Sequence, residues 1–466
     1  MRLAVTVSKD AVSAAVALGQ FVDGAPTPYH AVDSAMEMLR DAGFVEVFEG
    51  QRWPSTPGRY VTTRGGSLVA WSTERLSDSG VVQQWPAQAS FSVVGAHTDS
   101  PNLRLKPKAD YRSAGWDMLG VEVYGGPLLT TWLDRDLGLA GRVAVRDASA
   151  SGGYAMRLFR CDEPLLRVAN LAIHLDRSSG AGGVEMNRQS HLAPLWGFSG
   201  GMSFPRWVSE QVDCAPDDVL SFEAMAYDLL PASLLGHSRE LLASPRLDNL
   251  CTTFAATEAM KQAVLTPSEE GPARVAGAGK GPRVPVLVLF DHEEIGSETS
   301  SGARSQLLAS VLERIVLSCG GDRADVLAAL SSGLHVSGDM AHAIHPNYAD
   351  RSEPHNYPVI GGGPVLKVNA QGRYATDTGG AAAFGVACER GGITPQVYVH
   401  RTDLPCGSTV GPASAANLGM TTVDVGAAML SMHSVREVMA ARDVEPYTRA
   451  LAAVLGAEVS APGLVA

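Results

Sequence analysis

The chain has 466 residues, of which 45% are hydrophobic and 18% are charged. These fractions are those of ordinary globular proteins, and they exclude collagen-like, disulfide-scaffold and wholly disordered chains. At roughly 150 residues per domain we expect more than one domain. The 37 basic and 49 acidic residues give a formal net charge of −12. Because this charge repels phosphate backbones and anionic lipids at long range, we expect no nucleic-acid partner and no membrane partner.

The cysteines and the N-terminal residues indicate the cellular compartment. The six cysteines are scattered and form no CxxC pair, which favours free thiols in a reducing environment over a disulfide framework. Lys9 and Asp10 interrupt the apolar N-terminal stretch, and no run approaches the ~18 apolar residues of a membrane span. We therefore expect a cytoplasmic protein.

The N-terminal part of the chain predicts a helix and then a buried strand. Thr27-Pro28 is a helix-start signal, apolar residues are spaced helically over 31–39, and Gly43 follows as a stop. Residues 91–95 form a short apolar run that leads into the polar segment 96–101. In α/β sheets the functional side chains lie at the carboxyl ends of such strands.

The pattern changes from about residue 105 to residue 235. Short β-type runs, such as 119–124 and 142–145, alternate there with turn residues, which is typical of an antiparallel β unit. The sequence thus predicts an α/β unit made of residues 1–104 and 236–466, with a β-rich domain inserted at 105–235.

Helix and strand signals return after the insertion. Helical spacing extends over 246–264, and a Gly/Pro-rich loop is expected over 266–285. The strongest strand signal in the chain, 284–290, follows and leads into Asp291-His292-Glu293-Glu294. The fold class predicted is therefore α/β.

Several carboxylate and imidazole side chains follow apolar strands or lie in turns. Such ligands, with no clustered thiolate, suit catalytic Zn²⁺, Co²⁺ or Mn²⁺. Each of these groups taken singly has a structural interpretation, such as a hydrogen-bonded histidine or a surface ion pair between Asp248 and Arg246. The candidates are His97, Asp99, Asp248, Glu293, Glu294, Asp339 and His433.

Two patterns favour a metal more directly. Glu293 and Glu294 are adjacent carboxylates at the end of an apolar strand, where they repel each other unless a cation lies between them. His97 and Asp99 have the i, i+2 spacing that puts both side chains on one side of an extended segment. We expect the carboxylate of Asp99 to accept the second ring N–H of His97, as partners of metal-bound histidines do. One carboxylate that bridges two ions would complete a hydrolytic centre.

Seven segments together resemble the M18 family of metallo-aminopeptidases, the aspartyl aminopeptidases. They occur in order along the chain: GAHTDSPNLRLKP (95–107), SPRLDNL (244–250), FDHEEIGSET (290–299), GDMAHAIHPNY (338–348), GGPVLKVNAQGRYAT (362–376), DLPCGSTVGP (403–412) and MHSVRE (432–437).

The resemblance implies a mixed sheet flanked by helices, of the zinc-aminopeptidase type, with an inserted β-rich dimerisation domain and self-association into dimers and a dodecamer. It implies two divalent metal ions, most simply zinc, with cobalt or manganese as alternatives. The implied ligands are His97, Asp248, Glu294, Asp339 and His433, with Asp248 bridging. Glu293 is the implied general base, and Asp99 is also assigned to the catalytic set.

The resemblance also implies how a peptide is recognised. His342, Lys367 and Tyr374 match positions that face the substrate, together with Glu293 and Asp339. A buried cation beside a phenol suits a carboxylate, so we expect a preference for peptides that begin with Asp or Glu. His174 matches a histidine that reaches the site of a neighbouring subunit, and the alternative that it binds metal stays open.

Two motif-like segments and two rival functions remain. Residues 197–201 match the GxSxG nucleophile pattern at Ser199, but we expect only a Gly-rich loop there, because no clean apolar strand precedes it and Pro205 follows closely. AGAGKG (276–281) lacks the spacing of a phosphate loop. The rivals to an aminopeptidase are a metal-dependent amidohydrolase or carboxypeptidase and a non-catalytic, metal-stabilised scaffold.

Overall fold

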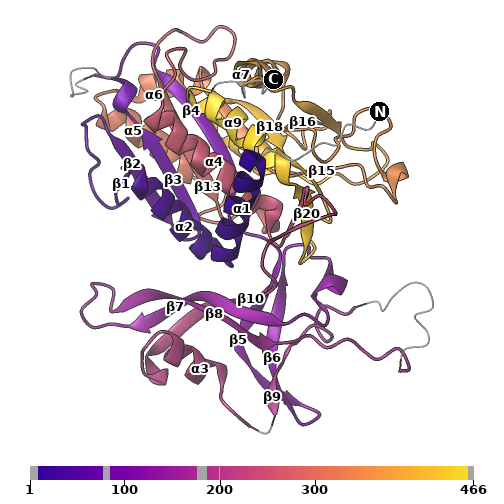
Figure 1. The fold of residues 1–466 in the computed structure, drawn as a ribbon. Coiled ribbons are helices and arrows are strands. Elements are labelled where there is room, and N and C mark those ends of the chain that lie inside the picture. Colours follow the sequence, from indigo (N-terminus) through magenta and orange to yellow (C-terminus); the bar gives the residue numbers. More distant parts are fainter. Residues whose placement is uncertain (1–8, 77–83, 176–185, 199, 460–466) are drawn as a thin grey trace.

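The computed structural model describes residues 9–76, 84–175, 186–198 and 200–459. The chain forms a larger layered α/β unit and a smaller, mainly β unit, which is drawn in purple and magenta in the lower part of Figure 1. Among these described residues, no helix is both long and apolar enough to cross a membrane.

The larger unit is built on a mixed sheet of nine strands. They are β1 (Val45–Glu46), β2 (Arg59–Arg64), β3 (Ser67–Ser72), β4 (Ser90–His97), β13 (Arg283–Phe290), β14 (Leu334–Gly338), β16 (Val365–Val368), β17 (Gln396–Val399) and β18 (Thr421–Gly426). The order across the sheet is β1-β2-β3-β13-β4-β14-β18-β16-β17. The central strands β13, β4, β14 and β18 run parallel, whereas β3 and β16 are antiparallel to their central neighbours. The carboxyl ends of four adjacent strands therefore lie at one edge.

Helices cover both faces of this sheet. One face carries α1 (Lys9–Gly24), α2 (Pro28–Asp41), α4 (Leu247–Leu265), α7 (Thr378–Arg390) and α9 (Val444–Leu455), and the other carries α5 (Leu307–Ser318), α6 (Arg323–Ser331) and α8 (Val410–Leu418). Figure 1 shows α1, α2, α4 and α9 packed side by side.

The sequence of β13 explains why two layers of helices are needed. Leu287 and Leu289 belong to the core under α1, α2 and α4, whereas Val286, Val288 and Phe290 belong to the core under α5 and α8. Successive side chains of a strand point to opposite faces, so an uninterrupted apolar run buries both.

Two predicted helices are present with nearly the predicted bounds. α2 begins after Thr27, whose hydroxyl accepts a hydrogen bond from the backbone N–H of His30 as an N-cap, and Pro28 occupies the first turn. α4 covers the segment predicted at 246–264, but the backbone of Asp248 and Asn249 departs from helical angles at its start.

The smaller unit is an antiparallel sheet of six strands with its own apolar core. The strands are β5 (Asn102–Ser113), β6 (Trp116–Tyr124), β7 (Leu137–Arg146), β8 (Tyr154–Leu166), β9 (Leu195–Phe198) and β10 (Val219–Asp228), and α3 (Phe204–Gln211) packs against them. Their order is β8-β7-β10-β5-β6-β9.

A five-stranded sheet completes the larger unit. It consists of β11 (Ser233–Leu235), β12 (Leu241–Ser244), β15 (Ala341–His342), β19 (Ala428–Leu430) and β20 (Glu437–Ala440), in the order β11-β12-β20-β19-β15. The segment that follows β10 therefore already pairs with strands of the larger unit.

The surroundings of the GxSxG segment differ from those predicted. β9 precedes it and α3 follows it, with Pro205 in the first turn of the helix, where proline is well tolerated. The backbone N–H groups of Gly200 and Gly201 donate to Asp117. Ser199 itself lies outside the described residues. Residues 200–203 carry no helix or strand, in keeping with the expected Gly-rich loop, but the strand before it and the helix after it were not predicted, because a short strand and a proline-led helix give weak periodic signals.

Candidate metal centre

The candidate ligands gather at the carboxyl edge of the central strands. His97 is the last residue of β4 and lies opposite Phe290, the last residue of β13. Glu293 and Glu294 follow β13 in a short 3₁₀ turn, and Asp339 follows β14 directly. Parallel strands bring these segments, far apart in sequence, to one place.

The distances divide the cluster into two groups that share Asp248. Nε2 of His97 lies 3.5 Å from Oδ1 of Asp248 and 3.7 Å from Oδ1 of Asp339. Nε2 of His433 lies 3.4 Å from Oδ2 of Asp248 and 3.4 Å from Oε1 of Glu294. The two carboxylate oxygens of Asp248 thus face different histidines.

Burial and missing hydrogen bonds show that the cluster fits a divalent cation. Oδ1 of Asp248 and Oε1 of Glu294 are buried and have no hydrogen-bond partner. Burial, followed by repulsion from Asp248 and Glu293, raises the pKa of Glu294 well above its ordinary value. Buried carboxylates crowded in this way are costly unless a cation compensates them, and carboxylate with imidazole is a ligand set that zinc accepts.

Both histidines are oriented by backbone carbonyls. Nδ1 of His97 donates to the backbone oxygen of Asp99 at 3.0 Å, while the carboxylate oxygen Oδ1 of Asp99 lies 3.4 Å away. The expected partner of the ring, the carboxylate, is thus replaced by the carbonyl of the same residue. Nδ1 of His433 donates to the backbone oxygen of Gly126 at 3.0 Å. In each ring Nε2 is left facing the cluster.

The carboxylate of Asp99 instead holds the turn that carries the two glutamates. Its Oδ1 accepts the backbone N–H of Glu293 and its Oδ2 that of Glu294, both at 3.1 Å. The hydroxyl of Tyr124, on β6 of the smaller unit, donates to Oδ2 at 2.7 Å. Asp99 therefore fixes the backbone position of Glu293 and Glu294.

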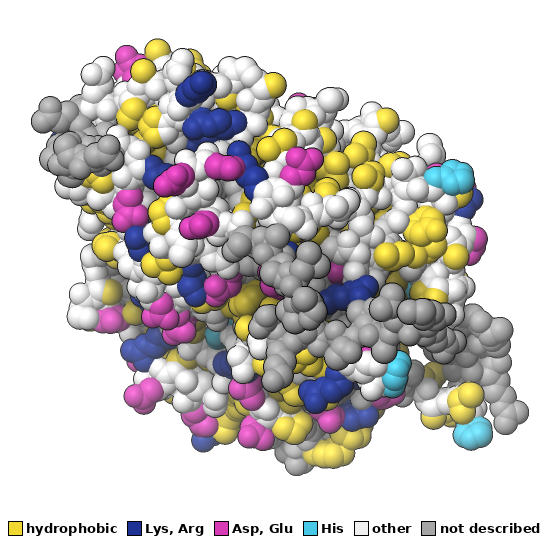
Figure 2. All heavy atoms as spheres, turned by 45° about the horizontal axis from the view of Figure 1, so that its top comes forward, with side chains coloured by type: hydrophobic (Ala, Val, Ile, Leu, Met, Phe, Trp, Pro, Cys, Tyr) yellow, Lys and Arg dark blue, Asp and Glu magenta, His cyan; other side chains and the backbone are white. Residues whose placement is uncertain are grey.

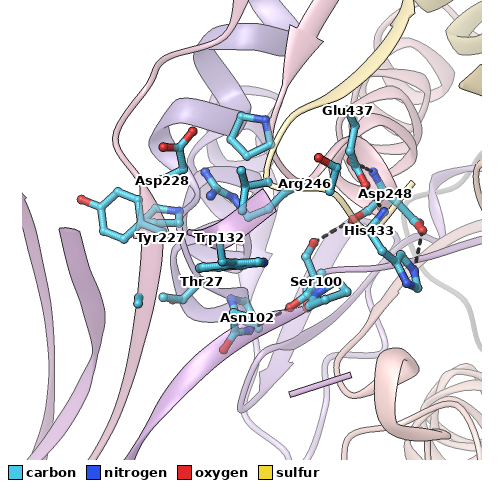
Figure 3. A pocket seen from close by; sticks show the side chains of 18 residues that line it. Thr27, Ser100, Asn102, Trp132, Tyr227, Asp228, Arg246, Asp248, His433 and Glu437 are labelled. Atoms are coloured by element: carbon cyan, nitrogen blue, oxygen red, sulfur yellow. Dashed lines mark hydrogen bonds and ion pairs between the residues drawn. The ribbon is translucent and has the colours of Figure 1, made fainter. Parts of the chain in front are cut away.

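Glu437 has an equivalent role that the sequence reasoning missed. Its Oε1 accepts the backbone N–H of His433 at 2.7 Å and its Oε2 that of Asp248 at 3.0 Å, and the residue is 2% exposed. Figure 3 shows the three side chains together at one side of a cavity between the two units, where Ser100 also donates to the backbone oxygen of Asp248. Glu437 lies in the matched segment MHSVRE, but only its inward orientation on β20 reveals the contact.

Glu293 also lies beside His97, with which it and Glu294 form a third possible ligand group, and it lines the cavity next to the cluster. Its Oε2 is 3.9 Å from Nε2 of His97, and its side chain is 17% exposed. Burial, partly offset by His97 and reinforced by Asp339, raises its pKa to about 8. Part of this rise comes from the neighbouring carboxylates, whose charge a bound cation would compensate.

A cavity with an empty volume of about 660 Å³ opens beside the cluster and is lined by His342, Lys367 and Tyr374. Lys367 is 2% exposed; its Nζ donates to the backbone oxygen of Met340 at 3.1 Å and lies 3.7 Å from Oδ2 of Asp339. Nζ is also 5.1 Å from the centre of the Tyr374 ring. The structure therefore brings the predicted substrate-facing residues of the larger unit together.

His174 is not brought to this cavity within one chain. It lies on an exposed turn of the smaller unit, flanked by Ile173 and Leu175, which are 78% and 75% exposed. The potential metal-binding groups found among the described residues do not include it.

The site is a buried cluster of imidazoles and carboxylates at the carboxyl edge of a mixed sheet, beside an open cavity. These features are typical of the class of metal-dependent α/β enzymes. A family model described as aminopeptidase I zinc metalloprotease (M18) matches residues 21–454. The chain belongs to the M18 family of metallo-aminopeptidases.

Relatives and solved structures agree with this assignment. The chain is 47% identical over 450 residues to a probable M18 family aminopeptidase 2 of Mycobacterium tuberculosis, covering 95% of this chain and 98% of the relative. It is 44% identical over 439 residues to the protein of that name in Streptomyces coelicolor, covering 93% and 96%. A chain in the complex of Ape4 and Nbr1 aligns with 36% identity and a TM-score of 0.86, covering 97% of this chain and 87% of that one.

The fold is also similar to that of an M18 aminopeptidase from Thermotoga maritima, with a TM-score of 0.81 at 21% identity and 97% coverage of both chains.

Proposed function

We propose that the protein is a two-metal aminopeptidase that hydrolyses the first peptide bond of substrates with a free N-terminus and prefers Asp or Glu at that position. The observation that supports it best is Asp248, whose two oxygens each face a different histidine. In this proposal His97, Asp248 and Asp339 hold one ion, and Asp248, Glu294 and His433 hold the other. Zinc is the metal proposed, with cobalt and manganese as alternatives.

Two ions bound there would polarise the scissile carbonyl and acidify a water molecule. Glu293 removes the proton of that water, because its carboxyl group lines the cavity beside the proposed ligands. After the attack on the carbonyl carbon, Glu293 returns the proton to the nitrogen of the leaving amine. His342, which lines the same cavity, donates to the oxygen that gains negative charge.

Lys367 supplies the selectivity in this proposal. The buried Nζ lies beside the ring of Tyr374 and lines the cavity that also contains Glu293 and Asp339. A substrate carboxylate would accept a charge-assisted hydrogen bond from this cation, which is shielded from water. Because the net charge of −12 repels acidic peptides at long range, the preference has to arise from such a local contact.

Glu293→Gln tests the mechanism. The amide keeps the size of the side chain but takes up no proton, so we expect turnover of an Asp-initiated peptide to fall by about 10³-fold or more. Metal content, measured on the same preparation, should stay unchanged. Turnover near the wild-type value would contradict the role of Glu293, and catalytic inactivity of the metal-loaded wild type would favour a scaffold.

Paired peptides separate the proposed activity from the related hydrolases. We expect cleavage of a peptide with a free N-terminal Asp and none of its N-acetylated form, because the free amine is part of what an aminopeptidase recognises. Cleavage of the acetylated form alone would indicate an amidohydrolase or a carboxypeptidase instead.

Self-association forms part of the proposal. One solved structure similar in fold is described as the dodecamer of Saccharomyces cerevisiae mApe1, with 24% identity and a TM-score of 0.77. In this chain the exposed apolar residues Leu171, Ile173 and Leu175 surround His174 on the smaller unit, as expected of a surface that contacts another subunit. We place His174 in the site of a neighbouring subunit.

A further inference from the structure

A second cavity adjoins the cavity that contains Lys367, and the two meet at Glu293 and Glu294. It has an empty volume of about 670 Å³ and shares Glu293, Glu294, Ser408 and Thr409 with the cavity that contains Lys367. Arg304 is the only basic side chain among the described residues that line it. Each of the two cavities that meet at Glu293 therefore carries its own cation of the Lys or Arg type.

The backbone at Arg304 is held firmly. Its N–H donates to the backbone oxygen of Ser297 at 3.3 Å. The side-chain amide of Asn417, in α8, donates to the carbonyls of Ala303 and Ser305 at 3.2 and 3.3 Å. Gly302 packs so closely that an added Cβ would lie 2.3 Å from the backbone oxygen of Ser297. The origin of the Arg304 side chain is thus fixed relative to the turn that bears the two glutamates.

The guanidinium of Arg304 is held only loosely. Its Nε lies 3.9 Å from Oε1 of Glu298, and the two side chains are 59% and 80% exposed. Exposed ion pairs with this geometry contribute little and are exchanged readily. The cation is therefore available to another carboxylate.

The start of α8 also lines this cavity, together with Glu293 and Glu294. Ser408, Thr409 and Ala413 line this cavity at the start of α8, where Thr409 is the N-cap and accepts a hydrogen bond from the N–H of Gly411. The N-terminal end of a helix carries partial positive charge. The carboxylate of Asp424, which accepts a hydrogen bond from the Thr409 hydroxyl, already lies at this helix end, so Arg304 is the main attraction for an anion.

From these observations we propose that Arg304 binds a carboxylate on the leaving side of the scissile bond. The proposal rests on the aminopeptidase function proposed above: with the first residue in the Lys367 cavity and the reacting carbonyl at Glu293, the second residue lies in the cavity of Arg304. The carboxylate belongs either to an acidic side chain at the second position or to the C-terminus of a dipeptide. The planar guanidinium fits a carboxylate through two parallel hydrogen bonds.

The test compares kcat/KM on matched peptides. The pair Asp-Glu-Ala-amide and Asp-Gln-Ala-amide reports on the side chain, and the pair Asp-Ala and Asp-Ala-amide reports on the terminal carboxylate. We expect the wild type to favour the charged member of at least one pair by about fivefold, and Arg304→Gln to abolish that preference by slowing cleavage of the charged member more than that of the neutral one. Arg304→Glu should reverse the preference.

Arg323→Gln is the matched control, because Arg323 is an exposed arginine at the start of α6 that pairs with Glu313 of α5 and lines neither cavity. It should leave both ratios as in the wild type. Equal rates on charged and neutral members in the wild type, or an unchanged preference in Arg304→Gln, would overturn the role of Arg304 while leaving the aminopeptidase proposal intact. A wild type that cleaves none of the four peptides would instead overturn the proposed function, and the role of Arg304 with it.

Discussion

Two buried carboxylates, Asp99 and Glu437, hold the backbone of four residues of the cluster in place. Asp99 accepts the N–H groups of Glu293 and Glu294, and Glu437 accepts those of Asp248 and His433. The orientation of the ligands thus depends on side chains that lie behind them, an arrangement that strengthens metal binding in other proteins.

Glu437→Gln should therefore weaken metal binding. A glutamine has one oxygen where the glutamate has two, so one of the two N–H groups loses its acceptor. We expect zinc affinity to fall by about 10- to 100-fold, measured by competition with a chelator. Glu445→Gln on α9 is the control; an affinity of Glu437→Gln equal to that of this control would contradict the positioning role.

Lys367→Met tests selectivity at the same scale. Removal of the buried cation should lower kcat/KM on peptides that begin with Asp by about tenfold or more, with a much smaller change on peptides that begin with Leu. Equal losses on both would show that Lys367 serves the structure of the site and not its selectivity.

His335, in β14, should make stability depend on pH. The ring is fully buried, neither nitrogen has a hydrogen-bond partner, and burial lowers its pKa from 6.5 to about 4. Between these two values the unfolded chain binds a proton that the folded chain does not, so the free energy of unfolding falls as the pH falls through this window.

His335→Leu should reduce this dependence. Between pH 7.5 and pH 5 we expect the loss of stability to be about 2 kcal/mol smaller than in the wild type, measured by urea unfolding at both pH values. Other acid-sensitive groups affect both proteins alike. An identical loss in the two proteins would show that His335 does not titrate in this window.

At the scale of elements, β13 joins the two helical layers to the metal cluster. Leu289 is fully buried one residue before Phe290, which pairs with His97. Leu289→Ala should lower the free energy of unfolding by about 3 kcal/mol, because it leaves a cavity under the helices, as measured by urea denaturation. Leu317→Ala at an exposed position of α5 should change it by less than about 0.5 kcal/mol. Similar values for the two variants would mean that the core relaxes into the space.

The elements with strong local signals were predicted closely. The spacing of apolar residues indicates the strands β13 and β4, and the capping residue at its start indicates the helix α2. β9 and α3 were missed because a four-residue strand and an eight-residue helix are too short for a period to be visible. The division at 105 and 235 stays a prediction; the sheet of the smaller unit begins with β5 at Asn102 and ends with β10 at Asp228, and β11 already pairs with β12.

At the scale of the whole molecule, the smaller unit takes part in the candidate metal centre. Tyr124 donates to Asp99, the carbonyl of Gly126 orients His433, and the N–H of Leu128 donates to the backbone oxygen of His433. On the face drawn in Figure 2, acidic and basic side chains of the described residues are interspersed.

Mixing inactive subunits tests whether the site is shared. If His174 acts in a neighbouring subunit, assemblies formed from His174→Ala and Glu293→Gln chains contain some sites with both intact residues. We expect activity to recover to a measurable fraction of the wild type after dissociation and reassembly of the mixture. Activity no higher than that of the separate variants would contradict a site shared between subunits.

The sequence by itself determined the α/β class and the M18 resemblance and named the candidate metal ligands, because these depend on local periodicity and on motifs that are contiguous in the chain. Only the tertiary structure decided which oxygen faces which histidine, that Glu437 points inward and that Arg304 lines a second cavity. Those contacts join segments up to about 190 residues apart, such as Asp248 and Glu437. Their geometry follows from strand register and packing, which no local pattern encodes.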